Sequence, residues 1–173
     1  MTRQLLVAAF PPNETHAFLD RYVGLSQFRP SPWRNWLVTL ATLDGVAEAT
    51  EPQLAEALAR LASAERPFKL SLAPGRIVAK PEHERVIALS PSQGTDELAL
   101  LADRVRAACT DAGAPPTGEG FVPAVTTAYN ALGITTLDTW DPIVWEIDAF
   151  ELVTRSSNRV MATYSTVREF VFP

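Results

Sequence analysis

One short segment occurs twice in the sequence, and this repeat limits the folds that the chain can adopt. Residues 37–41 read Leu-Val-Thr-Leu-Ala and residues 124–128 read Ala-Val-Thr-Thr-Ala, so both have the form apolar-Val-Thr-x-Ala. A proline and an aromatic residue precede each copy, and both copies are rich in strand-forming residues. Side chains two residues apart on a strand share a face, so we expect Leu37 beside Thr39 and Ala124 beside Thr126. The repeat predicts two lobes about a pseudo-twofold axis, with these faces meeting in a cleft.

The rest of the chain predicts a mixed arrangement of strands and amphipathic helices. Helices are expected over residues 13–25, from the apparent capping box at 50–53 onwards, and from Thr95 as a cap to a stop at Gly113. Asp44-Gly45 is expected to end the strand that carries the first copy. The strands are expected at 4–10, 36–43, 68–78, 85–89, 121–129, 144–153 and 161–172. These elements predict an α+β fold with mainly antiparallel sheets, in a single domain spanning residues 1–173.

Composition narrows the possible ligands and partners. The formal net charge is −5, which disfavours RNA as a partner because phosphate binding needs clustered Lys and Arg, although a local basic patch would be compatible with it. His16 and His83 are the two histidines and Cys109 is the single cysteine, so we expect no metal site and no cofactor. The apolar runs are too short for a membrane helix, and residues 1–11 read as a strand rather than a signal peptide. A cytoplasmic protein without a membrane partner is expected.

With these surroundings, the repeat resembles the signature of the two-histidine (2H) phosphoesterase superfamily, the 2′-5′ RNA ligase-like or cyclic phosphodiesterase-like proteins. Their signature is His-apolar-Thr/Ser-apolar, once per lobe, and the segments at 36–46 and 121–129 are similar to the two copies. The Phe-x-Pro at 121–123 is also typical of this family, and the similarity extends over nearly the whole chain. The resemblance implies a two-lobed, pseudo-twofold fold in which two mainly antiparallel sheets surround a central cleft, with the helices outside.

The resemblance also implies which residues would carry the chemistry. In the family one histidine is a general base and the other a general acid on a phosphodiester, and the paired hydroxyls hold phosphate oxygens. Leu37 and Ala124 stand at the two histidine positions, and neither can carry a proton. Thr39 and Thr126 remain at the hydroxyl positions, where they are either ligand-binding groups or ordinary strand residues. The expected cleft is therefore apolar, lined by threonine and without a proton shuttle.

Other candidate residues carry weaker signals. Arg34 could meet an anion at the mouth of the cleft, and Tyr129 follows the second copy of the motif. Trp36, Trp145 and Cys109 are expected to be core residues.

Three functions are compatible with this sequence. The first is a protein that uses the cleft to bind a small molecule or nucleotide without hydrolysing it. The second is a repurposed enzyme that isomerises or cyclises an organic, biosynthetic substrate by positioning it. The third is an inactivated 2′-5′ RNA ligase or cyclic phosphodiesterase, whether natural or engineered.

Overall fold

A computed structural model describes residues 2–12, 29–30, 36–72, 76–79, 85–118, 120–129, 142–157 and 162–173. The helix expected at 13–25, both histidines and Arg34 lie outside these residues. The described helices are α2 (Glu51–Ala64) and α3 (Thr95–Asp111), with a 3₁₀ turn, η3 (Glu48–Thr50), before α2. The strands are β1 (Thr2–Ala9), β2 (Arg29–Pro30), β3 (Val38–Ala47), β4 (Phe68–Leu72), β5 (Arg76–Ala79), β6 (Arg85–Leu89), β7 (Pro91–Gln93), β8 (Val125–Tyr129), β9 (Ile143–Ile147), β10 (Ala149–Ser157) and β11 (Ala162–Val171).

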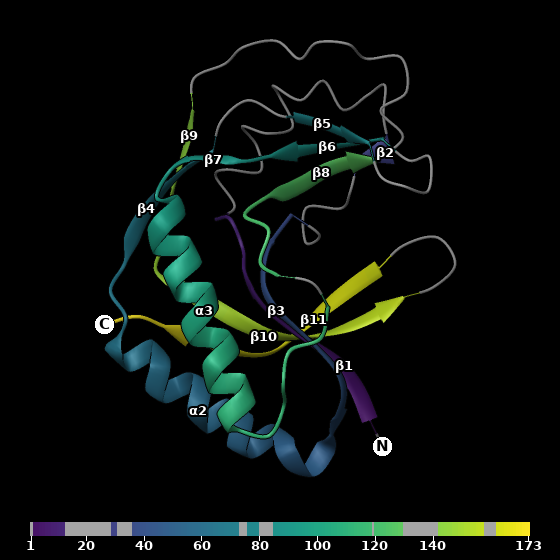
Figure 1. Ribbon diagram of the computed structural model, residues 1–173, viewed down its shortest axis with the longest axis vertical. Helices are drawn as coiled ribbons and strands as arrows, with labels where there is room; N and C mark the ends of the chain where they lie inside the picture. Colours follow the sequence, from purple (N-terminus) through teal and green to yellow (C-terminus); the bar gives the residue numbers. More distant parts are fainter. Residues whose placement is uncertain are drawn as a thin grey trace.

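The described strands form antiparallel sheets, as the sequence predicts. One sheet has the order β11-β10-β1-β3 and a second has the order β2-β8-β6-β5, while β7-β4-β9 form a smaller third sheet. The first two sheets lie towards opposite ends of the view in Figure 1, and α2 and α3 flank the first sheet on its left. The predicted α+β class is confirmed.

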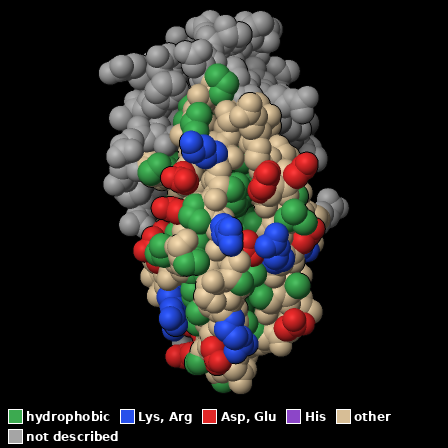
Figure 2. Space-filling view, turned by 90° about the vertical axis from the view of Figure 1, so that its left-hand side faces the viewer, with side chains coloured by type: hydrophobic (Ala, Val, Ile, Leu, Met, Phe, Trp, Pro, Cys, Tyr) green, Lys and Arg blue, Asp and Glu red, His purple; other side chains and the backbone are tan. Residues whose placement is uncertain are grey.

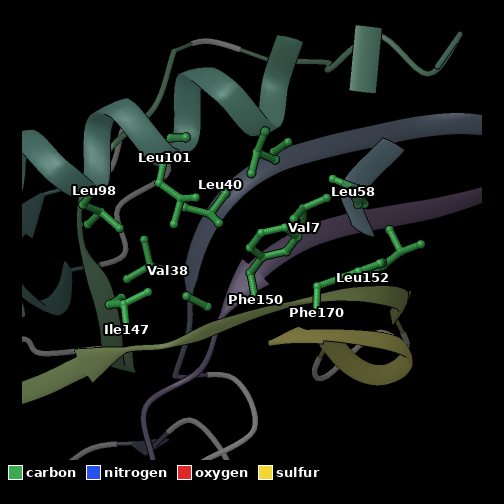
Figure 3. Close-up of a cluster of buried hydrophobic side chains, with 14 of the residues drawn as sticks. Val7, Val38, Leu40, Leu58, Leu98, Leu101, Ile147, Phe150, Leu152 and Phe170 are labelled. Atoms are coloured by element: carbon green, nitrogen blue, oxygen red, sulfur yellow. The ribbon is translucent and has the colours of Figure 1, made fainter. Parts of the chain in front are cut away.

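The main core lies between the helices and one face of the β11-β10-β1-β3 sheet. Leu58 of α2 and Leu98 and Leu101 of α3 point towards Leu40 of β3 and Phe150 of β10 (Figure 3). The rings of Phe150 and Phe170 lie 5.3 Å apart between centroids. Trp36, Trp145 and Cys109 are buried, which confirms that they are core residues. Burial of these apolar side chains fixes the sheet against the helices.

Several predicted element boundaries are wrong for local backbone reasons. Asp44-Gly45 does not end its strand, because Gly45 takes a φ of 69° within an irregularity and β3 continues to Ala47. Thr50 makes no side-chain cap, because its backbone is helical as the last residue of η3, whereas a capping threonine needs an extended backbone. Gly94 occupies the cap position of α3, so Thr95 is the first helical residue.

Three predicted strands also differ from those observed. The expected strand at 144–153 is divided into β9 and β10, which belong to different sheets. The expected strand at 68–78 is divided into β4 and β5, which belong to different sheets. The expected strand at 121–129 begins only at Val125, because Pro123 lacks an N–H and the Ala124 amide donates to the Val122 carbonyl oxygen at 2.9 Å. Within the described ranges, no helix has the length and apolarity that would let it cross a bilayer.

Candidate functional site

The first copy of the repeat contains a β-bulge. On β1, Val7 pairs with Ala41, but its neighbour Ala8 pairs with Thr39. Leu40 is therefore an extra residue of β3 without an opposite partner on β1. A bulge of this kind changes the alternation of side chains along the strand.

The second copy contains a β-bulge at the equivalent position. Ile87 of β6 pairs with Ala128, and Ala88 pairs with Thr126, so Thr127 is the extra residue of β8. In both copies the bulge directly follows the motif threonine, and the threonine pairs with an alanine. The two copies therefore share a backbone irregularity as well as a sequence pattern.

Leu37 and Ala124 occupy matching places just before these strands. The sequence places both on the strands, but β3 begins at Val38 and β8 begins at Val125. Leu37 is buried, with 7% of its surface exposed, and Ala124 is half-buried. The Leu37 side chain, at the start of the first copy, is thus packed away from solvent.

The bulge at Leu40 puts two threonines on one face of the sheet. Residues that are paired directly across antiparallel strands share a face. Thr39 pairs with Ala8 and Thr42 pairs with Leu6, and these β1 residues alternate with the core residues Leu5, Val7 and Ala9. Thr39 and Thr42 therefore lie on the face away from the core, and both are half-buried. Leu40 and Ala41 both belong to the core cluster.

A pocket of about 340 Å³ lies along the outer edge of β3. Residues from both faces of this terminal strand line it, together with α3 and the segment that leads into β8. Its volume is in the range of small-molecule sites, and its wall combines hydroxyl, cationic and apolar groups. The described lining residues are Thr39, Leu40, Ala41, Thr42, Arg106, Thr117, Gly120, Phe121, Val122 and Ala124.

A hydrogen-bonded contact fixes one end of this pocket. The Thr117 amide donates to the Thr42 carbonyl oxygen at 2.7 Å, which attaches the segment after α3 to the edge of β3 (the segment runs upwards to β8 in Figure 1). The Thr117 hydroxyl also donates to Asp44 Oδ2 at 2.7 Å, and Gln4 Nε2 donates to Asp44 Oδ1 at 2.6 Å. The bond from Thr117, helped by that from Gln4 and by the charge of Arg155, holds the pKa of the Asp44 carboxyl below its ordinary value. The Asp44 carboxylate that accepts the Thr117 hydroxyl is therefore ionised at neutral pH.

The structure brings together two of the residues that the sequence selects. Thr39 and Ala124, one from each motif, line the same pocket, whereas Leu37 does not. Thr126 and Tyr129 lie on β8, and their side chains are outside the described part of the structure, as is the whole of Arg34.

Sequence reasoning missed Thr42, Arg106 and Thr117. Strict alternation from Thr39 puts Thr42 on the opposite face, and only the bulge at Leu40 brings it back. Arg106 looks like an ordinary polar residue of an amphipathic helix, and Thr117 lies in a loop. A cation on the border of the apolar face of α3 was the one available signal for Arg106.

Comparisons with known proteins agree with this fold. The profile of the 2'-5' RNA ligase superfamily matches residues 11–159. The structure is similar to E. coli LigT complexed with 3'-AMP, with a TM-score of 0.80 and 21% identity over 99% of each chain. It is also similar to E. coli LigT complexed with NADP+, with a TM-score of 0.80 and 20% identity over 99% of each chain.

A further solved structure, TT0787 of Thermus thermophilus, has a TM-score of 0.78 and 22% identity over 98% of this chain and 97% of that one. None of the curated proteins compared with the sequence matches it. The profile covers most of the chain and the fold extends over nearly all of it, so this chain belongs to the 2'-5' RNA ligase superfamily.

Proposed function

We propose that this protein binds a small organic molecule or nucleotide in the pocket beside β3 and does not perform the acid–base phosphodiester chemistry of two-histidine enzymes. The observation that carries the proposal is that Thr39 and Ala124, from the two copies of the motif, line one pocket of small-molecule size.

The chemical support comes from the two positions at which the resemblance places imidazoles. A general acid or base must exchange a proton within hydrogen-bonding distance of the substrate, and neither Leu37 nor Ala124 can do so. His16 and His83 belong to neither motif strand. A reaction that depends on two imidazoles is therefore not expected from this chain.

The physical support comes from the composition of the pocket wall. Phe121, Val122 and Ala124 are apolar residues of the wall. Thr39 and Thr42 of β3 are its hydroxyl-bearing residues on the strand side. Such a wall suits a ligand with an apolar body and a few polar groups. Crystal structures of E. coli LigT contain 3'-AMP, ATP or NADP+, so nucleotides are reasonable first probes.

A thermal-shift screen of nucleotides and small aromatic compounds tests the binding function. A ligand at about 100 times its dissociation constant should raise the melting temperature of a chain of this size by about 5–10 °C. Thr39→Val should reduce this shift, because it removes the hydroxyl and keeps the shape. Thr39→Ser, which keeps the hydroxyl, is the matched control, and Thr126→Val tests the second motif. If no ligand gives a shift that depends on either threonine, the proposal is wrong.

An activity assay tests the missing chemistry separately. The wild-type chain should leave 2′-5′ diesters and 2′,3′-cyclic phosphates uncleaved, and hydrolysis of either by the pure protein would contradict the proposal. The double variant Leu37→His with Ala124→His tests the alternative of an inactivated phosphoesterase. Hydrolysis by this folded variant would favour that alternative, and its continued inactivity would count against it.

A further inference from the structure

Arg106 places a cation in the wall of the pocket. It lies on α3, is half-buried, and is the one charged residue among the described residues that line the pocket. Within the described part of the chain, no carboxylate forms an ion pair with its guanidinium, whereas Arg104, two residues earlier, binds Glu65 at 2.8 Å. A guanidinium that lines a pocket and has no ion-pair partner among the described residues is suited to bind an anionic group of a ligand.

The other polar residues that line the pocket limit which ligand can bind there together with Arg106. The Thr117 hydroxyl donates its hydrogen to Asp44, so towards the pocket this oxygen can only accept. Thr39 and Thr42 also line the pocket, from the face of β3 that lies away from α3. The planar guanidinium of an arginine matches the geometry of a carboxylate, which it can bind through two parallel N–H groups.

We propose that the ligand of this pocket is an organic molecule with a single negatively charged group, a carboxylate, which Arg106 binds while Phe121, Val122 and Ala124 contact its apolar body. This inference rests on the proposed binding function and specifies the ligand class. A single charge is favoured over a phosphate dianion, because the pocket has one described cation and the Asp44 carboxylate stands directly behind Thr117. A second negative charge on the ligand would meet that carboxylate without a second cation.

Two fluorescent probes with the same apolar body test this inference. 8-Anilinonaphthalene-1-sulfonate carries one fixed negative charge, and N-phenyl-1-naphthylamine lacks it. We expect wild-type protein to bind the anionic probe more tightly than the neutral one. Arg106→Gln should lower the affinity for the anionic probe about tenfold, the usual effect of losing a charge-assisted hydrogen bond. It should change the affinity for the neutral probe less than about twofold. Arg106→Lys should give an intermediate loss, because it keeps the charge and loses the planar fork.

The controls separate the ligand class from the pocket itself. Arg60→Gln removes an exposed arginine of α2 that does not line this pocket, and should leave both probes unchanged. Equal affinity of wild type and Arg106→Gln for the anionic probe would overturn the role of Arg106. The pocket itself would still be supported if Ala124→Phe, which fills it, abolished binding of both probes. If Ala124→Phe bound both probes as tightly as wild type does, the proposed binding function would fail as well.

Competition distinguishes a carboxylate from a phosphate. Benzoate should displace the anionic probe from wild type at lower concentration than inorganic phosphate does, and Arg106→Gln should remove this difference. Stronger displacement by inorganic phosphate would contradict the assignment to a carboxylate.

Discussion

Leu40 and Thr127 occupy the same position in the two halves of this protein: each is the extra residue of a β-bulge that directly follows the motif threonine. The sequence repeat alone is a five-residue pattern of frequent residue types, and such a pattern could arise by chance. A shared irregularity in the pairing of two strands in different sheets is a stronger relationship, because bulges are specific features of a backbone. It supports the pseudo-twofold arrangement that the repeat predicts.

The bond between Thr117 and Asp44 should make stability depend on pH. The pKa of Asp44 is lower in the folded chain than in the unfolded one, so its ionised form stabilises the fold at neutral pH, and this contribution is lost as the pH falls through the folded value. Thr117→Val should destabilise the protein at neutral pH by less than about 1 kcal/mol, as expected for an exposed hydrogen bond. Urea unfolding at neutral pH and below pH of about 3 should show that this difference shrinks in acid. Thr117→Ser keeps the hydroxyl and should behave like wild type, and an equal effect of Thr117→Val at both pH values would contradict the interpretation.

The ion pair between Arg104 and Glu65 should contribute measurably to stability. It joins α3 to the end of α2 with contacts of 2.8 and 2.9 Å, and the Glu65 side chain is only 9% exposed. Arg104→Met should lower the free energy of unfolding by about 1–3 kcal/mol, because it leaves a buried carboxylate without its partner. The matched control is Arg60→Met on α2, whose partner Glu56 is 70% exposed, and it should cost less than about 0.5 kcal/mol. Denaturant unfolding measures both values, and equal losses would show that burial of Glu65 does not matter.

Gly94 should tolerate no side chain. Its φ is 78°, and a Cβ atom added here would collide with the carbonyl oxygen of Lys69. Gly94→Ala should destabilise the protein by about 2–4 kcal/mol, since the strain of a positive φ and the collision act together. Gly45 also has a positive φ, of 69°, but its Cβ would enter open space. Gly45→Ala should therefore cost only about 1–2 kcal/mol, and thermal unfolding of the two variants separates the two effects.

Cys109 should be chemically protected in the folded protein. It is buried in α3, and burial raises the pKa of its thiol to about 12, so the reactive thiolate is scarce at neutral pH. A thiol reagent such as dithionitrobenzoate should react only as fast as the chain opens, and quickly in denaturant. A variant that combines Cys109→Ala with Ser63→Cys, which puts the thiol on an exposed position of α2, should react at once. Rapid reaction of native wild type would contradict the observed packing of α3.

The surface of the helices is consistent with the charge argument made from composition. On the face shown in Figure 2, acidic and basic side chains alternate and form no continuous basic area among the described residues. A protein that binds a nucleic-acid backbone needs such an area. The described part of this face therefore offers no support for RNA as a partner.

The sequence alone predicted the class of the fold and most of its elements. Apolar periodicity is a local property, so the stripe of Leu98, Leu101 and Val105 correctly predicted the buried face of α3. The boundaries were harder, because they depend on contacts made elsewhere in the chain. Thr50 has the residue type of a cap, but η3 gives it a helical backbone, and Gly94 takes the cap position of α3 against Lys69.

The sequence by itself determined the repeat and the residues at its equivalent positions, with Leu37 and Ala124 at the start of the two copies and a threonine two residues after each. Only the tertiary structure decided which groups form the pocket. The register of β1 against β3 makes Leu40 a bulge and turns Thr42 to the side of Thr39, and the bond from Thr117 to Thr42 sets the opposite wall. Arg106 reaches the same pocket from a helix more than sixty residues away in sequence. Strand register and helix packing are set by burial over the whole chain, so no local pattern could have shown that these residues meet.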